Sequence, residues 1–134
     1  MHAPLTQLKI LIVDDSAIIR SRLTSLLSDL PHVEIVDEAD DAPQALELIR
    51  LRKPDVVILD IHLTHGSGLN LLPDIKRDRP AVVVIILTNY PYPQYRDKCL
   101  ADGADFFFDK SSEFERVISV VESIGDETAS NEAV

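Results

Sequence analysis

The sequence predicts an α/β fold in which five parallel strands alternate with five helices along the chain. Five short apolar segments typical of strands are separated by segments whose apolar residues recur every three or four positions, as they do on helices. Three of the strand segments are apolar on both faces, which is typical of strands buried between two layers of helices. A length of 134 residues, 46% of them hydrophobic, suits one domain with a single core.

The predicted strands are short runs that end at polar residues. Segments 10–13, 56–59 and 82–87 contain only valine, isoleucine and leucine, so they are expected at the centre of the sheet. The remaining two are less uniform and shorter in their apolar part. In chain order, the strands are expected at residues 8–13, 33–38, 56–59, 82–87 and 105–108.

The first three helices follow from apolar stripes and their boundary residues. An apolar stripe that begins at Ile19 is followed by Pro31, which cannot continue a helix. The second helix is expected after Asp41, whose side chain suits an N-cap. The third contains Pro73, so we expect it to start late or to bend.

The last two helices set the expected end of the domain. The prolines of segment 90–93 delay the fourth helix, which should be short and end near Gly103. Ser112 and Glu115 have the spacing of a capping box that opens the fifth helix. We therefore expect an N-terminal extension at residues 1–7, the folded domain at 8–125 and a flexible acidic tail at 126–134.

Right-handed crossovers leave few ways to connect such a sheet, and the flavodoxin-like strand order 2-1-3-4-5 is favoured. The fold class is therefore a doubly wound (βα)₅ sheet. Ligands of such sheets bind outside the carboxyl ends of the strands. The residues that directly follow the strands are consequently the candidates for function.

Composition excludes several classes of function. A net charge of −10 argues against nucleic acid as a partner, because phosphates require a basic surface. The longest apolar stretch, 81–87, is too short to cross a bilayer, and the first residues lack the apolar run of a signal peptide. We therefore expect a cytoplasmic protein with no membrane partner. The single cysteine, Cys99, cannot form an internal disulfide and is expected to be a buried helix residue.

Polar residues follow four of the five predicted strands. Asp14 and Asp15 follow the first strand, Asp60 the third, Thr88 the fourth and Lys110 the fifth. The three carboxylates repel one another and need a cation to remain ionised together. Mg²⁺ suits such oxygen ligands and usually keeps several waters, which leaves room for a phosphate oxygen. The sequence therefore predicts an Mg²⁺ site at this edge.

The same residues suit transfer of a phosphoryl group. A carboxylate can attack phosphorus to give an aspartyl phosphate, and Asp60 is the candidate acceptor. Such transfer depends on positioning and on cancelling the charge of the phosphoryl oxygens. Mg²⁺ can neutralise one oxygen, Lys110 another, and the Thr88 hydroxyl can donate to a third.

These residues carry a resemblance to the receiver domains of bacterial two-component response regulators, of the single-domain chemotaxis-regulator type. The resemblance covers roughly residues 8–124. The matching pieces, in chain order, are IleLeuIleValAspAsp at 10–15, ValValIleLeuAsp at 56–60, Gly68, Thr88, and GlyAlaAspPhePhePheAspLys at 103–110.

The resemblance implies a role for each site residue. Asp60 is expected to accept a phosphoryl group from a histidine kinase or a phosphotransfer protein. Asp15 is expected to bind Mg²⁺ directly, Asp14 through water or more loosely, and the backbone carbonyl of His62 is expected to be a further ligand. Lys110, together with the threonine after the fourth strand, would hold the phosphoryl oxygens.

The resemblance also implies a switch. Phe107 matches an aromatic position that changes rotamer as Thr88 is drawn inward in the family. This movement would remodel the face formed by the fourth helix, the fifth strand and the fifth helix, where a downstream protein, not identified by the sequence, would bind. The new charge would shift an equilibrium between two existing conformations.

The sequence departs from the family pattern in several places. Thr64 stands where the family often has a proline. Ser111, in place of another frequent proline, predicts an ordinary trans bond after Lys110. His62 and Tyr90 lie two residues after the acceptor and the threonine, at positions that tune phosphoryl lifetime in the family. Whether they impede or position an attacking water stays open.

Two alternatives to a signalling switch agree less well with the sequence. A small phosphatase could use Asp60 as a turnover nucleophile, but such enzymes place a second aspartate two residues on, where this chain has His62. A docking module that is never phosphorylated would have no need for the complete set of site residues. The protein is therefore expected to take part in phosphoryl transfer without being a turnover enzyme.

Overall fold

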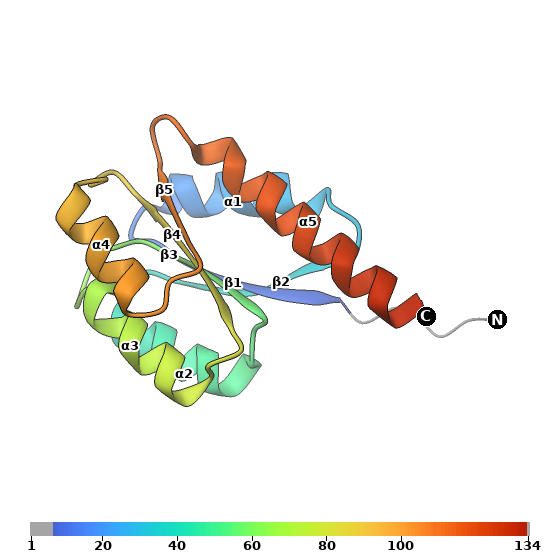
Figure 1. Ribbon diagram of the computed structural model, residues 1–134, viewed down its shortest axis with the longest axis horizontal. Helices are drawn as coiled ribbons and strands as arrows, with labels where there is room; N and C mark the ends of the chain where they lie inside the picture. Colours follow the sequence, from blue (N-terminus) through green and yellow to red (C-terminus); the bar gives the residue numbers. More distant parts are fainter. Residues whose placement is uncertain (1–6, 134) are drawn as a thin grey trace.

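The fold was analysed in a computed structural model, which describes residues 7–133, with side chains up to residue 127. Its centre is one parallel sheet with the strand order β2-β1-β3-β4-β5, which confirms the predicted topology. Figure 1 shows the sheet between two layers of helices. The strands are β1 (Leu8–Val13), β2 (Val33–Ala39), β3 (Val56–Leu59), β4 (Val83–Thr88) and β5 (Phe106–Asp109).

The five helices divide between the two faces of the sheet (Figure 1). One face is covered by α1 (Ala17–Ser28) and α5 (Phe114–Ala133). The other is covered by α2 (Ala42–Arg52), α3 (Gly68–Asp78) and α4 (Pro93–Ala101). Both faces of the central strands are therefore buried, as their continuous apolar sequences predict.

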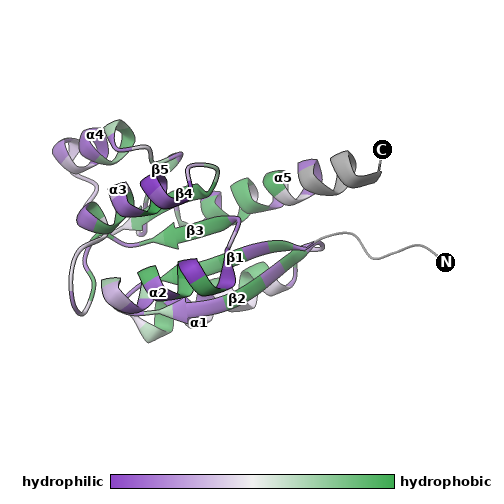
Figure 2. Ribbon diagram, turned by 90° about the horizontal axis from the view of Figure 1, so that it is seen from below, coloured by the Kyte–Doolittle hydropathy of each residue, from purple (hydrophilic) through white to green (hydrophobic). Residues whose placement is uncertain are grey.

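Alternation along β3 shows how one strand serves both faces. Val56 and Ile58 pack in the cluster with α1 and α5, whereas Val57 and Leu59 pack in the cluster with α2, α3 and α4. All four side chains are buried. In Figure 2 this strand is hydrophobic along its length, while helix surfaces carry hydrophilic residues. The core thus fixes the position of β3, which ends directly before Asp60.

Short polar side chains begin the first three helices. Ser16 accepts a hydrogen bond from the Ile19 amide at α1, and Asp41 accepts one from the Gln44 amide at α2, so the predicted Asp41 N-cap is confirmed. Ser67 similarly accepts one from the Leu69 amide at α3. Each of these caps satisfies an amide that has no partner inside its helix.

Of the two outcomes predicted for the third helix, a late start or a bend, the late start is wrong and the bend stays a prediction. Helix α3 begins at Gly68 and contains Pro73. A proline inside a helix removes one backbone hydrogen bond. Leu72 and Ile75 are fully buried against the sheet, and this apolar burial outweighs the loss.

The predicted capping box of the fifth helix is also wrong. Helix α5 begins only at Phe114, and the Ser112 hydroxyl donates to the Asp109 carboxylate, 3.1 Å away. Asp109 also accepts from the amide and hydroxyl of Ser111, and these bonds lower the pKa of the Asp109 carboxyl. The serines therefore belong to the turn after β5. The peptide bond between Lys110 and Ser111 is trans, as predicted.

The predicted bounds of the domain, residues 8 and 125, stay a prediction. Helix α5 continues through the segment from Asp126 to Ala133, which was predicted to be a flexible tail. This segment contains no proline, and extending an existing helix costs far less than starting one. Of the predicted N-terminal extension, only Gln7 lies within the described residues. Across the described residues, every helix is too short or too polar to span a membrane.

Candidate functional site

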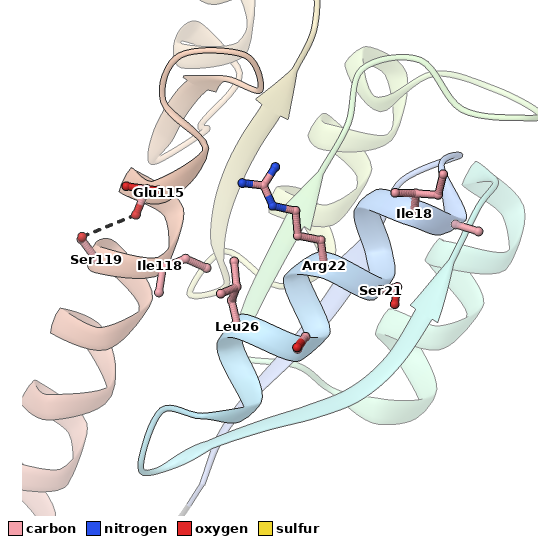
Figure 3. Close-up of a pocket in the computed structure, with 9 residues that line it drawn as sticks. Ile18, Ser21, Arg22, Leu26, Glu115, Ile118 and Ser119 are labelled. Atoms are coloured by element: carbon pink, nitrogen blue, oxygen red, sulfur yellow. Dashed lines mark hydrogen bonds between the residues drawn. The ribbon is translucent and has the colours of Figure 1, made fainter.

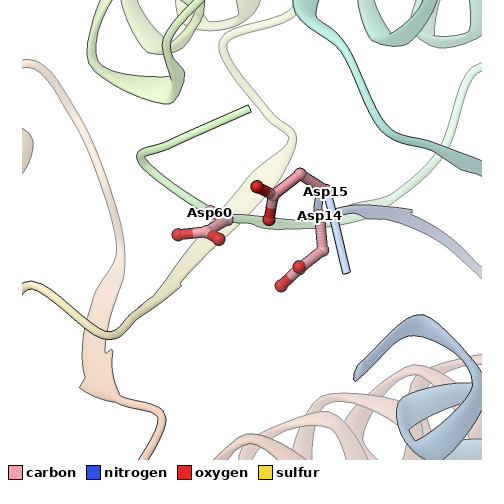
Figure 4. Close-up of side chains that lie close together, drawn as sticks. All are labelled: Asp14, Asp15 and Asp60. Atoms are coloured by element: carbon pink, nitrogen blue, oxygen red, sulfur yellow. The ribbon is translucent and has the colours of Figure 1, made fainter. Parts of the chain in front are cut away.

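Three carboxylates converge at the carboxyl ends of β1 and β3. Asp14 and Asp15 follow β1, and Asp60 follows β3. The two strands are neighbours, and the Asp60 amide donates to the Val13 carbonyl at 2.9 Å. One oxygen of each carboxylate lies within 4.8 Å of the others. Figure 4 shows the three side chains close together. Asp14 and Asp60 are buried, whereas Asp15 is exposed.

Lys110 joins the two buried carboxylates. Its Nζ lies 2.8 Å from Oδ2 of Asp14 and 2.8 Å from Oδ2 of Asp60. The Lys110 side chain is buried, and the backbone amide of Lys110 donates to the Thr88 carbonyl at 2.9 Å. The predicted approach of groups from β1, β3 and β5 is therefore confirmed, and the contact is direct.

Burial and charge act against each other in this cluster. Burial raises the pKa of the Asp14 carboxyl, although the hydrogen bonds from Lys110 and Ser16 oppose that rise. Burial also acts to lower the pKa of Lys110, but the hydrogen bonds to Asp14 and Asp60 outweigh it and the net direction is upward. Three carboxylates and one ammonium leave two negative charges uncompensated. This excess matches the charge of one divalent cation.

Thr88 ends β4, between the strand that leads to Asp60 and the strand that leads to Lys110. The side chain is fully buried, and its Oγ1 accepts a hydrogen bond from the Tyr90 amide at 3.0 Å. Since that bond uses the hydroxyl oxygen as acceptor, the hydroxyl proton can be donated elsewhere. Thr88 is thus placed at the same edge as the charged residues.

Phe107 points into the core. It is 5% exposed and packs in the cluster under α2, α3 and α4. The Arg96 guanidinium of α4 lies 5.8 Å from the centre of its ring. The neighbouring Phe108 packs on the opposite face of the sheet with α1 and α5, as strand alternation predicts.

The turn after β3 packs closely against the start of α3. The Asp60 Oδ1 accepts from the Ile61 amide at 2.7 Å, and the Gly68 amide donates to the Ile61 carbonyl at 2.7 Å. A Cβ on Gly68 would lie only 2.1 Å from the Asp60 carbonyl oxygen. The glycine is therefore required by this close approach. The segment 65–68, which follows the strand, is a turn that leads into α3.

His62 and Tyr90, two residues after Asp60 and Thr88, form an aromatic contact. Their ring centres are 4.1 Å apart in an edge-on arrangement, and Tyr95 lies 6.5 Å from the His62 ring. Both His62 and Tyr90 are exposed. The contact joins the turn after β3 to the loop after β4.

Arg20 was missed by the sequence reasoning. Its Nη1 donates to the Asp14 backbone carbonyl at 2.7 Å, and its Nε lies 3.1 Å from Oε1 of Glu38. Charged residues on a helix and on an edge strand are ordinarily solvated, so neither one stands out in the sequence. The usable signal was the position of Arg20 four residues after the N-cap Ser16, one helical turn from the site.

An apolar groove of about 880 Å³ lies between α1 and α5, apart from the carboxylates. Figure 3 shows Ile18 and Leu26 of α1 and Ile118 of α5 lining it. Ile18 is 80% exposed, which is unusual for an isoleucine. Arg22 and Glu115 also line the groove. The groove contains none of the predicted site residues.

Solved structures with the same fold are receiver domains. The signal receiver domain of an HD domain-containing protein from Pseudomonas fluorescens Pf-5 is 28% identical, with a TM-score of 0.81 over 99% of this chain and 97% of that one. The response regulator domain of Thermotoga maritima CheB is 26% identical, with a TM-score of 0.79 over 92% and 97%. These similarities extend over nearly the whole of each domain.

Curated relatives are longer than this chain. The sensory transduction protein LytT of Enterococcus faecalis is 36% identical over 118 residues, which is 88% of this chain and 48% of the relative. A protein-glutamate methylesterase/protein-glutamine glutaminase of Carboxydothermus hydrogenoformans is 36% identical over 117 residues, or 86% of this chain and 34% of the relative. The chain thus spans between about a third and a half of these two relatives.

The family comparison agrees with the topology and with the cluster of charged residues. A profile described as the response regulator receiver domain matches residues 10–122, from within β1 to within α5. This range includes all of the predicted site residues. The chain therefore belongs to the receiver domain family of response regulators.

Proposed function

We propose that Asp60 is the phosphoryl acceptor of this receiver domain, which is a phosphorylation-dependent signalling switch. The observation that carries the proposal is the position of Lys110, whose Nζ lies 2.8 Å from both Asp60 and Asp14. A phosphoryl group on Asp60 would meet an ammonium already in place. Charge stabilisation by groups fixed beforehand is the main requirement of phosphoryl transfer.

The residues present fit an Mg²⁺ ion. The donors are carboxylate oxygens from three aspartates, which is the chemistry this hard cation prefers, and two negative charges in the cluster are uncompensated. The exposed Asp15 suits direct coordination, and the backbone carbonyl of His62 is the further proposed ligand. Asp14, already bonded to Lys110 and the Ser16 amide, suits coordination through water. When bound, Mg²⁺ would neutralise charge on a phosphoryl oxygen.

The chain's own groups then have defined roles. A carboxylate oxygen of Asp60 would form a bond to phosphorus while the bond between phosphorus and the donor's histidine nitrogen breaks. Lys110 would hold one phosphoryl oxygen, and the Thr88 hydroxyl proton would be donated to another. His62 and Tyr90, which contact each other two residues after Asp60 and Thr88, would limit how water reaches the acyl phosphate.

The proposed output follows from the placement of Thr88 and Phe107 on neighbouring strands. Movement of Thr88 toward the phosphoryl group would vacate space beside β5 and favour a different packing of Phe107. Phe107 packs under α4 and beside Arg96. Its rearrangement would therefore change the surface formed by α4, β5 and α5. A downstream protein would then bind this surface with altered affinity.

The proposal extends to the partners and the location of the domain. Receiver domains of response regulators interact with histidine kinases or phosphotransfer proteins, and we propose such a protein as the phosphodonor. The net charge of −10 disfavours direct binding of nucleic acid. We also propose that the domain is located in the cytoplasm. We propose no turnover activity for the chain, since His62 occupies the position where a phosphatase of this kind has its second aspartate.

The proposal is tested by incubating the protein with Mg²⁺ and acetyl phosphate and measuring intact mass. A mass increase of one phosphoryl group is expected for the wild type and is abolished in Asp60→Asn. Asp97→Asn, an exposed aspartate on α4, should label like the wild type. Labelling of Asp60→Asn, or rapid release of phosphate without any adduct, would overturn the assignment.

A further inference from the structure

The turn that carries the first two carboxylates is held at every polar group of Asp14. Its amide donates to the Ala39 carbonyl at 3.0 Å, and its Oδ1 accepts from the Ser16 amide at 2.9 Å. Its Oδ2 lies 2.8 Å from the Lys110 ammonium. Its backbone carbonyl accepts from Arg20 at 2.7 Å. Of these contacts, the Arg20 contact alone comes from a side chain outside the charged cluster.

Arg20 is in turn fixed by a second layer of contacts. Its Nε lies 3.1 Å from Oε1 of Glu38 on β2, and the hydroxyl of Thr24, one turn further along α1, donates to Oε2 of the same carboxylate at 3.4 Å. The Arg20 side chain is only 19% exposed. Helix α1, strand β2 and the turn after β1 are therefore linked through one guanidinium.

The planar guanidinium is suited to this task because it presents several donors in fixed directions and holds two acceptors at once. The acceptors here are a carbonyl that precedes Asp15 and a carboxylate on a different strand. Asp15 itself is exposed, so its position depends on the turn that carries it. Repulsion among the three carboxylates favours opening of that turn, and Arg20 opposes the opening.

We propose that Arg20, supported by Glu38 and Thr24, is a positioning residue that sets the Mg²⁺ affinity of the site. Arg20 touches neither the metal nor the phosphoryl group; it acts through the backbone of Asp14. The inference rests on the proposed function, because it assumes that Asp14, Asp15 and Asp60 bind Mg²⁺. Loss of a residue that orients metal ligands typically weakens metal affinity by about 10–100-fold.

The test is titration of the full chain with MgCl₂ in a calorimeter. Arg20→Ala is expected to weaken Mg²⁺ binding by about 10-fold. Arg20→Lys keeps the charge but cannot hold both acceptors in one plane, so its affinity should be intermediate. Arg52→Ala is the matched control, because Arg52 pairs with Asp37 on the same edge strand, at 3.5 Å, and does not contact the turn. Its affinity should equal that of the wild type.

A second readout needs no metal. The Ser16 amide, which donates to Asp14, should exchange its hydrogen faster in metal-free Arg20→Ala than in the wild type, and at an unchanged rate in Arg52→Ala. If Arg20→Ala does not fold, Glu38→Gln removes the charge that holds Arg20 and should also weaken Mg²⁺ binding. Wild-type protein that binds no Mg²⁺ would instead refute the proposed function. Normal wild-type affinity with equal affinity in Arg20→Ala, Arg20→Lys and Glu38→Gln would refute the inference alone.

Discussion

Lys110 places its ammonium between two buried carboxylates, 2.8 Å from an oxygen of each. Its side chain is 5% exposed, so water does little to screen the three charges. Removing one member of a buried ionic cluster leaves the others without a partner, which costs far more than the loss of a surface pair. The stability of the metal-free domain should therefore depend on Lys110.

We predict that Lys110→Met lowers the free energy of unfolding by about 3 kcal/mol in metal-free buffer, because two carboxylates remain buried without a counter-charge. Urea unfolding measures the loss. Lys98→Met is the control, since Lys98 pairs with Asp102 at the surface, where such a pair contributes under about 0.5 kcal/mol. Equal losses in the two variants would show that the buried cluster has no special role.

Cys99 is fully buried in α4, as expected from its place on a helix. Burial raises the pKa of the Cys99 thiol to about 11, with a smaller contribution from Asp102. The folded state therefore holds the thiol proton more tightly than the unfolded chain. The resulting stabilisation is complete below the ordinary thiol pKa and is lost as pH rises through about 11.

We predict that iodoacetamide alkylates Cys99 at pH 8 at least about 100-fold more slowly than it alkylates the urea-unfolded chain, because the thiolate is the nucleophile. The rate should climb steeply as pH approaches the raised pKa. Mass spectrometry of timed samples measures it. A rate equal to that of the unfolded chain would contradict both the burial and the pKa direction.

At the scale of elements, the connection from β3 to α3 determines where the backbone of Asp60 lies. Gly68 begins α3 directly against the Asp60 carbonyl, and its amide closes the turn on the Ile61 carbonyl. A side chain here would push α3 away from the backbone of Asp60. Gly125 in α5 offers a contrast, because a Cβ there would meet its nearest neighbours, Pro31 and Val33, at 3.8 Å.

Opposite signs are predicted for these two glycines. Gly68→Ala should lower the free energy of unfolding by about 1–3 kcal/mol, because the added methyl group forces a backbone shift. Gly125→Ala should raise it by about 0.5–1 kcal/mol, since alanine loses less entropy in a helix and the space is available. Urea unfolding of both variants tests the pair, and a shift in the same direction would contradict the packing seen here.

The elements were predictable where apolar composition alone defines them. Strands at 8–13 and 56–59 match β1 and β3 at both ends, because polar or proline-containing segments bound both runs. The fourth and fifth strands each lie one residue later than predicted, because Thr88 pairs with Asp109 and extends the ladder into polar sequence. Such pairing is set by the neighbouring strand. Local composition does not contain it.

At the scale of the whole molecule, the strand order brings residues far apart in the chain to one edge. Asp60 follows β3 and Lys110 follows β5; β4 lies between these two strands, and Thr88 ends it. In the proposed switch, a change at Asp60 would reach α4 through Thr88 and Phe107. That coupling would require two packing arrangements of these side chains, both of them populated.

We predict that phosphorylation shifts the amide resonances of α4, β5 and the start of α5, in addition to those of the loops around Asp60. The spectra compare protein with and without acetyl phosphate in the presence of Mg²⁺. Helix α2 serves as an internal control. The Asp60→Asn variant should show no shifts in the α4–β5–α5 region or in the loops around residue 60. Shifts confined to the loops next to Asp60 would contradict the proposed switch through Phe107.

The fold class, the strand order and the identity of the residues at the functional edge were determined by the sequence alone. Apolar periodicity defines buried strands and helices, and the carboxyl ends of parallel strands necessarily meet at one edge. Asp14, Asp15, Asp60, Thr88 and Lys110 could be chosen on that basis, because each lies at the carboxyl end of a strand or within two residues after it.

Only the tertiary structure decided which groups touch. The direct bridge of Lys110 to Asp14 and Asp60, and the hold of Arg20 on the Asp14 carbonyl, depend on the distances between neighbouring strands and helices. Likewise, the need for a glycine at position 68 arises from one carbonyl of a different element. Lys110 is remote in the chain from both aspartates, and even the contacts between nearer residues depend on how separate segments pack. The geometry of all of them is set by packing of the whole core.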